Sequence, residues 1–212
     1  MGSLIFIIFL SYLVGSIPTA IILSKMFRGI DIRDYGSGNA GGTNAMRVLG
    51  WKIGSTVMMI DVFKGVVATL FISAIRFGPL SINPEIVQIL AGVSAIFGHI
   101  WTVFAGFRGG KGVGTGAGML ISLYPTVLLI CLAIFIFMLL IFRMVSLASM
   151  TAAVSLPIVL FLLSTFCNYQ VSELLLYFSI FIAILIVFTH RNNIQRILKG
   201  TENKIKLKKS AA

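Results

Sequence analysis

Three short polar segments, rich in glycine, cations and hydrogen-bond donors, interrupt a chain that is otherwise largely apolar. They read GSGNAGGTNAMR (36–47), FRGGKGVGT (107–115) and HRNNIQR (190–196). Backbone N–H groups of glycine-rich turns, together with lysine or arginine side chains, form concave binding sites for anions. We therefore expect these segments to bind phosphate groups.

The first segment combines glycines with side chains that can donate hydrogen bonds. Arg47 adds a planar, permanently charged group suited to phosphate. The spacing also satisfies G-x-G-x-x-G, but no strand precedes it, so the context argues against a dinucleotide-binding motif. A flexible loop between helices is the alternative interpretation. The candidate ligands of this segment are Gly36, Ser37, Gly38, Asn39, Thr43, Asn44 and Arg47.

The second segment presents Lys111 between Gly109, Gly110 and Gly112. This arrangement places a cation where backbone can approach an anion closely, at the N-terminus of a helix expected to begin near Gly112. It does not match the P-loop, because Ala105 stands in place of the first glycine and no Ser or Thr follows the lysine. The alternative is an ordinary basic loop.

The third segment places His190 and Asn193 on one face of a helix, with Arg196 on roughly the same side. Histidine exchanges protons near neutral pH, which makes His190 a candidate base. The alternative is a polar cap on a membrane helix. Ser146 and Ser149 begin another expected helix and could add hydroxyl donors, or could act only as caps.

Three ionisable residues, Asp61, Lys64 and His99, lie inside or at the end of apolar stretches. Asp61 and Lys64 are three residues apart and can pair, since either charge alone is costly in hydrocarbon. We expect them to brace the structure or to support the site. His99 precedes the second segment and is either a packing residue or a supporting one.

The composition indicates an all-α integral membrane protein. Of 212 residues, 58% are hydrophobic and only 11% are charged, and the mean hydropathy is +1.04. We expect one transmembrane domain over 1–212, with a basic tail at 198–212. A span needs about 20 apolar residues. Seven transmembrane helices are expected, at 4–26, 53–75, 85–106, 112–123, 124–142, 146–166 and 173–189.

The glycine-rich stretch 112–123 is short, but counting it places all three polar segments on one side of the membrane. All but two of the 17 Lys and Arg residues then share that side, the exceptions being Lys64 and Arg76. The positive-inside rule makes that side cytoplasmic, with the N-terminus outside and the C-terminus inside. The net charge of +11 thus reflects topology and contact with anionic membrane lipids, and not nucleic-acid binding.

Other kinds of chemistry lack their sequence patterns. The six acidic residues are scattered and offer neither a paired-carboxylate site nor a metal site, so no metal and no cofactor are expected. Cys131 and Cys167 lack the spacing of a zinc site and are expected to remain free. Neither histidine has an aspartate five residues on, since Phe104 and Gln195 stand there, and no G-x-S-x-G elbow is present.

Four stretches resemble the bacterial glycerol-3-phosphate acyltransferases that use acyl phosphate, and the resemblance covers effectively the whole chain. They are GSGNAGGTNAMRVLG (36–50), DVFKG (61–65), GHIWTVFAGFRGGKGVGT (98–115) and HRNNIQRILKGTENK (190–204). The resemblance implies acyl transfer from acyl phosphate to the 1-hydroxyl of sn-glycerol 3-phosphate, giving lysophosphatidic acid and inorganic phosphate for phospholipid synthesis. It also implies the bacterial cytoplasmic (inner) membrane, with the active site facing the cytoplasm. Thr102 and Gly114 depart from the family pattern, which usually has proline and alanine there.

Site roles follow the motif positions. Arg47 and Lys111 would bind phosphate and stabilise the leaving group, while His190 or the substrate's own phosphate would accept the hydroxyl proton. The oligomeric state stays open, with a monomer favoured. Residues implied in catalysis are Ser37, Asn39, Lys111, His190 and Asn193. Those implied in substrate binding are Gly36, Gly38, Thr43, Asn44, Arg47, Gly109, Gly110, Gly112 and Ser149, with support from Asp61, Lys64 and His99.

A transporter or flippase for a phosphate-bearing solute is the second hypothesis, because short glycine-rich helices are typical of transporter binding sites. The expected opening of all three segments to one side, and the lack of an inverted repeat, argue against it.

Overall fold

The computed structural model of the chain describes residues 1–205, and every regular element within them is helical. The chain forms two compact units, the first being Met1–Pro125 and the second beginning at Thr126. The single domain over 1–212 and the tail at 198–212 stay predictions, and residues 206–212 of that tail lie outside the described part.

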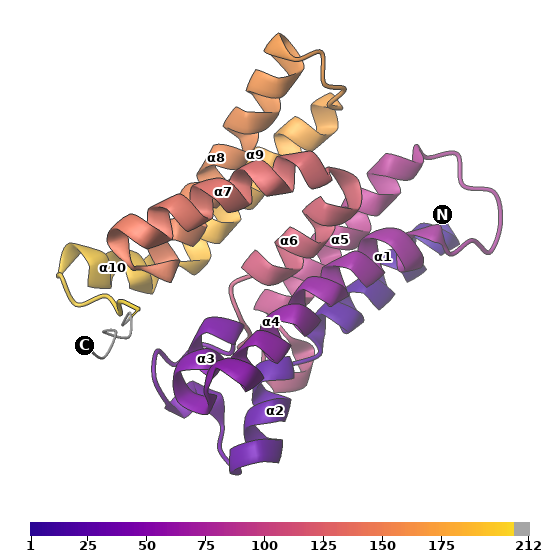
Figure 1. Cartoon of the computed structure of the whole chain (residues 1–212). Helices are drawn as coiled ribbons and strands as arrows, with labels where there is room; N and C mark the ends of the chain where they lie inside the picture. Colours follow the sequence, from indigo (N-terminus) through magenta and orange to yellow (C-terminus); the bar gives the residue numbers. More distant parts are fainter. Residues whose placement is uncertain (206–212) are drawn as a thin grey trace. The chain divides into compact units, whose positions relative to one another are not determined.

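The first unit is built on two pairs of closely packed helices, α1 with α5 and α4 with α6 (Figure 1). Gly15 of α1 and Gly98 of α5 allow the first contact, since a Cβ at either position would collide with backbone of the opposite helix. The helices of this unit are α1 (Gly2–Ser16), α2 (Thr19–Arg28), α3 (Gly42–Leu49), α4 (Trp51–Val66), α5 (Pro84–Ile100) and α6 (Val113–Leu123). Short turns of helix are η1 (Ile32–Asp34), η2 (Val67–Phe71), η3 (Ile72–Ala74) and η4 (Val103–Ala105).

The stretch expected as one helix over 4–26 is two helices separated by a break at Ile17–Pro18. Proline lacks an N–H and so removes a helical hydrogen bond at this point. The hydroxyl of Thr102 donates to the carbonyl of Ser16, the last residue of α1. After the break, α2 leads to Gly29, which has a positive φ of 67°, and the chain turns there toward the first polar segment.

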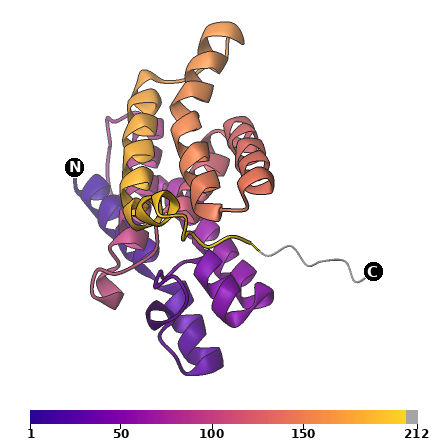
Figure 2. The ribbon, with the colours of Figure 1, turned by 90° about the vertical axis from the view of Figure 1, so that its left-hand side faces the viewer.

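The second unit contains α7 (Pro125–Phe142), α8 (Val145–Phe166), α9 (Glu173–Thr189) and α10 (Arg191–Leu198). Helices α8 and α9 pack side by side (Figure 2). Ser172 caps α9 by accepting a hydrogen bond from the Leu175 N–H at 3.2 Å. At His190 the chain bends by 59° from α9 into α10.

Within residues 1–205, five stretches are long and apolar enough to cross a membrane, and the bent pair α9–α10 is a sixth if it counts as one span. The five are Gly2–Arg28, Trp51–Ala74, Pro84–Ala105, Pro125–Phe142 and Val145–Phe166. The remaining expected span, 112–123, is the helix α6. It has only 11 residues and is about 16 Å long, whereas the hydrocarbon core of a membrane is ~30 Å thick. The multi-pass helical architecture is therefore confirmed, whereas the number of seven spans and their orientation stay predictions.

Candidate functional site

The first polar segment is organised around the buried side chain of Asn44, at the start of α3. Its Oδ1 accepts a hydrogen bond from the Ser37 N–H at 2.8 Å, and its Nδ2 donates to the carbonyls of Ile32 (3.1 Å), Tyr35 (3.0 Å) and Asn39 (3.0 Å). One amide thus fixes the backbone of the whole turn. From its position in the motif Asn44 was expected to bind substrate, and this structural role was not predicted.

The turn leaves several predicted ligands accessible. Ser37, Asn39 and Thr43 are half-buried and Arg47 is exposed. Thr43 and Arg47 are four residues apart and therefore share a face of α3. Gly36 has a φ of 63°, and a Cβ there would also collide with Oδ1 of Asn44, so glycine is required at this position.

The second segment folds back on the end of α5. The Gly109 N–H donates to the Ile100 carbonyl at 3.0 Å, and the Gly110 N–H donates to the His99 carbonyl at 2.9 Å. Gly112, with a φ of 85°, is the N-cap of α6. Half-buried Lys111 therefore lies beside the N-terminus of α6, where the helix dipole adds to its positive charge.

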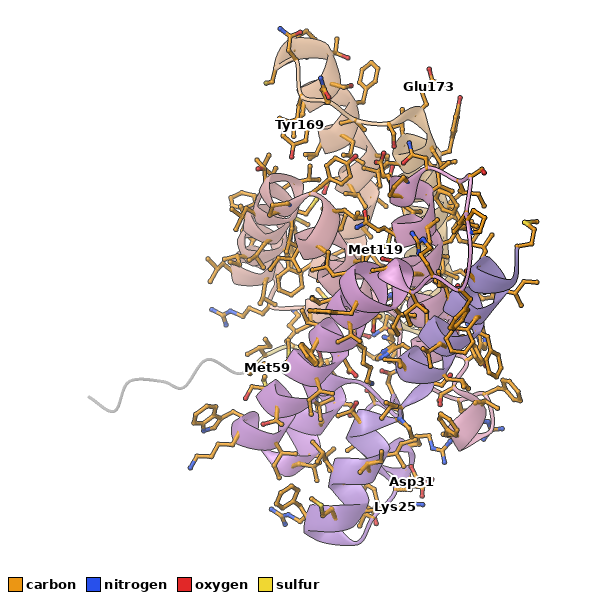
Figure 3. All side chains as sticks on the ribbon, turned by 90° about the vertical axis from the view of Figure 1, so that its right-hand side faces the viewer. Lys25, Asp31, Met59, Met119, Tyr169 and Glu173 are labelled. Carbon is orange, nitrogen blue, oxygen red and sulfur yellow. The ribbon has the colours of Figure 1, made fainter. Side chains whose placement is uncertain are left out.

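An ion pair in η1, which precedes the first segment, is hydrogen-bonded to η4, which precedes the second. The Arg33 guanidinium binds both carboxylate oxygens of Asp31, at 3.0 and 2.7 Å, and donates to the Ala105 carbonyl at 2.8 Å. These hydrogen bonds from Arg33 lower the pKa of Asp31 to about 2, and Lys25, which lies near Asp31 (Figure 3), adds to the effect. Asp31 therefore stays charged at neutral pH and holds Arg33 against the turn that precedes Lys111.

A small pocket in the first unit receives residues from both segments. Ala40 comes from the first segment and Gly109 and Gly110 from the second. The other lining residues are Ile17, Pro18, Thr19, Asp61, Lys64, His99 and Thr102. The three ionisable residues expected to support the site are thus grouped here, next to two predicted substrate-binding glycines.

In the second unit, His190 lies at the bend between α9 and α10 and is buried. Its Nδ1 is 2.8 Å from the Ile186 carbonyl oxygen. Because a carbonyl only accepts hydrogen bonds, Nδ1 carries the proton, and the basic lone pair of neutral His190 is on Nε2. This tautomer suits a proton acceptor.

Glu202 organises the rest of the third segment. Its carboxylate accepts hydrogen bonds from Asn193 Nδ2 (2.8 Å), Arg196 Nε (2.8 Å) and Ser146 Oγ (2.9 Å). Burial opposes ionisation of Glu202, but the hydrogen bonds from these three partners outweigh it and lower the pKa of the carboxyl. Asn193 and Arg196 do share a face, as predicted from their spacing.

Sequence reasoning missed Glu202. The available signal was a single acid within an otherwise basic tail, four residues after Leu198, where the helix of the third segment ends. Ser149, one turn after Ser146 on α8, is buried. The prediction that the third segment and Ser149 share a site with the first two segments stays a prediction.

Within residues 1–205, no group of three or more His, Cys, Asp or Glu side chains could hold a metal ion. The polar segments of the described part offer cations, hydroxyls and side-chain amides for binding anions. Together with the apolar helices, this defines the class: a multi-pass helical membrane protein with candidate anion-binding turns.

The family model for glycerol-3-phosphate acyltransferase matches residues 5–200. The chain belongs to this family.

Relatives named glycerol-3-phosphate acyltransferase align over nearly the full length. The protein from Chlorobium chlorochromatii (strain CaD3) is 47% identical, over 97% of this chain and 98% of its own. The protein from Chlorobium phaeobacteroides (strain BS1) is 45% identical, with the same coverage of both chains.

The fold is also that of a solved structure, PlsY (YgiH), an integral membrane glycerol 3-phosphate acyltransferase. Its glycerol 3-phosphate form superposes with a TM-score of 0.83 at 35% sequence identity, over 97% of this chain and 96% of that one. Its lysophosphatidic acid form gives a TM-score of 0.79 over the same shares.

Proposed function

We propose that this protein transfers a fatty acyl group from acyl phosphate to the 1-hydroxyl of sn-glycerol 3-phosphate. The hydroxyl oxygen attacks the acyl carbonyl carbon, the bond from that carbon to the bridging oxygen breaks, and inorganic phosphate leaves with the electron pair. Lysophosphatidic acid is the other product. The observation that carries the proposal is the pair of glycine-rich turns in the first unit, each followed by a cation, Arg47 or Lys111, in a chain that belongs to this family.

The chemistry needs positioning and charge neutralisation more than covalent catalysis, because acyl phosphate is already activated. Both substrates carry a phosphate, and the first unit supplies two cations, Arg47 and Lys111, each beside a glycine-rich turn. Ser37, Asn39 and Thr43 would hydrogen-bond the phosphoryl or carbonyl oxygens. Lys111, beside the N-terminus of α6, would stabilise the negative charge that develops in the transition state.

The hydroxyl proton needs an acceptor. His190, protonated on Nδ1, can accept it on Nε2. The phosphate of the substrate is the alternative acceptor, and Asn193, held by Glu202, would then orient that phosphate.

We further propose that the enzyme crosses the bacterial cytoplasmic membrane seven times, with its active site facing the cytoplasm. The distribution of basic residues supports this orientation. The acyl chain is apolar and would enter from the inner leaflet, while glycerol 3-phosphate would enter from water.

The assay uses purified protein in lipid nanodiscs with palmitoyl phosphate and radiolabelled glycerol 3-phosphate. We expect lysophosphatidic acid and inorganic phosphate in equal amounts, and no product when palmitoyl-CoA or palmitoyl-acyl carrier protein replaces the acyl phosphate. The absence of lysophosphatidic acid with every donor would refute the proposal. Uptake of labelled glycerol 3-phosphate into vesicles without acyl product would instead favour the transporter hypothesis.

A further inference from the structure

The cluster of Asp61, Lys64 and His99 has no part in the mechanism proposed above. All three residues are almost completely buried, with exposed fractions of 4%, 3% and 7%. Lys64 Nζ lies 2.7 Å from Asp61 Oδ1, and His99 Nδ1 lies 3.6 Å from the same oxygen. Charges buried in apolar surroundings are costly, so such a cluster is retained only where its members are paired and hydrogen-bonded.

Lys64 connects the cluster to the helix break. Its ammonium also donates to the Ile17 carbonyl at 2.6 Å. Ile17 lies between α1 and α2, where Pro18 interrupts the helix. Because α2 leads into the first polar segment, Lys64 fixes the point from which that segment departs.

His99 connects the cluster to the second segment. Its carbonyl accepts the Gly110 N–H at 2.9 Å. The imidazole lies against Gly110 so closely that a Cβ at this position would collide with Nε2, and a Cβ at Gly109 would collide with the His99 carbonyl oxygen. The ring is therefore held between the Asp61 carboxylate and the two glycines that precede Lys111.

We propose that Asp61, Lys64 and His99 are positioning residues that fix the Gly109–Gly110 turn, and hence Lys111, relative to the helix break that leads to the first segment. Asp61 is the common partner, binding Lys64 on one side and facing the His99 ring on the other. Gly114, in the first turn of α6, also lies against Asp61, since a Cβ there would be 3.3 Å from the Asp61 Cβ. Asp61 thus lies beside Gly114 at one end of the Lys111 turn and is connected to Gly110 at the other end through the His99 ring.

The alternative role is that of a packing brace, in which the cluster only holds α4 against the other helices. The two roles differ in what moves when the cluster is disturbed. A packing brace would loosen the whole first unit, whereas a positioning cluster would loosen residues 107–112 selectively.

Hydrogen–deuterium exchange of the purified full-length protein in nanodiscs separates these roles without relying on activity. For His99→Ala, we expect amide exchange in peptides covering 107–112 to rise about tenfold, the scale of losing one buried polar contact. Peptides from the middle of α1 and α5 should be unchanged. Tyr124→Phe is the matched control, because it removes a 2.6 Å hydrogen bond to Glu85 elsewhere in the same unit. Unchanged exchange at 107–112, or a uniform rise across the unit, would overturn the proposal.

Two further variants keep the test decisive. His99→Gln retains a side-chain donor and should recover part of the protection that His99→Ala loses. If His99→Ala does not fold, Asp61→Asn carries the same test, because it weakens the contacts to both partners while preserving the side-chain volume.

The kinetic part of the test rests on the proposed function. In an active enzyme, His99→Ala should raise the KM for a phosphate-bearing substrate by about tenfold with a smaller change in kcat, since the turn is displaced but no reacting group is lost. An inactive wild-type protein would refute the proposed function and leave the exchange result valid. An active wild type whose His99→Ala variant has unaltered KM values would refute the positioning role.

Discussion

Lys111 and Arg47 are the two cations of the first unit that we propose bind the substrate phosphates. Lys111 lies at the N-terminus of α6, directly after the glycines that line the pocket. Lys111→Ala should lower kcat/KM for acyl transfer by about 10²–10³-fold, the usual cost of removing one preorganised charge-stabilising group. Expression and thermal stability should be unchanged. Lys25→Ala removes an exposed cation of the same unit and should retain activity; equal losses in both variants would contradict the assigned role.

Substitutions at Asn44 and Ser37 distinguish a role in the structure of the first segment from a role in substrate binding. Asn44→Ala removes the four hydrogen bonds by which the Asn44 amide holds the first segment, and should reduce the free energy of unfolding by about 2 kcal/mol, because buried backbone groups lose their partners. Ser37 contributes only its backbone N–H to this network. Ser37→Ala should therefore lower activity while leaving the thermal unfolding midpoint unchanged. A normal midpoint for Asn44→Ala would contradict the account.

The sequence predicted which residues carry donors and cations, because those properties are intrinsic to the side chains. It could not predict that Asn44 is occupied within its own turn, since that depends on where four backbone groups fall after folding. Glu202 was missed for a similar reason. One of its partners, Ser146, is 56 residues away in the chain, and nothing in the local pattern pairs the two.

At the scale of elements, the link from η1 to η4 through Asp31, Arg33 and Ala105 positions the turn before Lys111. Its pH dependence follows from the lowered pKa of Asp31, about 2 against an ordinary 3.8. A lowered pKa in the folded state means that the stabilisation is complete above pH 3.8 and is lost as the pH falls toward 2.

The thermal unfolding midpoints of wild type and Arg33→Gln, measured between pH 6 and pH 2, test this link. The wild-type advantage should be constant at the higher pH values and should shrink below about pH 4. An advantage that does not change with pH would show that the ion pair contributes no stability.

The elements themselves were largely predictable, because apolar length sets the position of each membrane helix. Details that depend on backbone geometry were not predicted. The break at Ile17–Pro18 and the bend at His190 both lie inside or beside stretches that hydropathy treats as continuous. The short α6 was expected from its glycine-rich sequence. It has 11 residues, and whether it crosses the membrane decides whether the number of spans is odd or even.

At the scale of the whole molecule, an odd number of spans places the two ends of the chain on opposite sides of the membrane. Single cysteines at Gly2→Cys and Lys204→Cys, in a variant with Cys131 and Cys167 replaced by serine, report on each end. In intact cells, an impermeant maleimide should label the first and not the second. Labelling of both, or of neither, would require an even number of spans and would contradict the seven-helix topology.

The most direct measurement of the central claim follows the bridging oxygen of the donor. Palmitoyl phosphate labelled with ¹⁸O between carbon and phosphorus is mixed with glycerol 3-phosphate and the purified enzyme, and both products are analysed by mass spectrometry. If the glycerol hydroxyl attacks the acyl carbon, all of the label appears in inorganic phosphate and none in lysophosphatidic acid. Label released in palmitate, as attack on phosphorus would leave it, or no acylated product at all, would contradict the account.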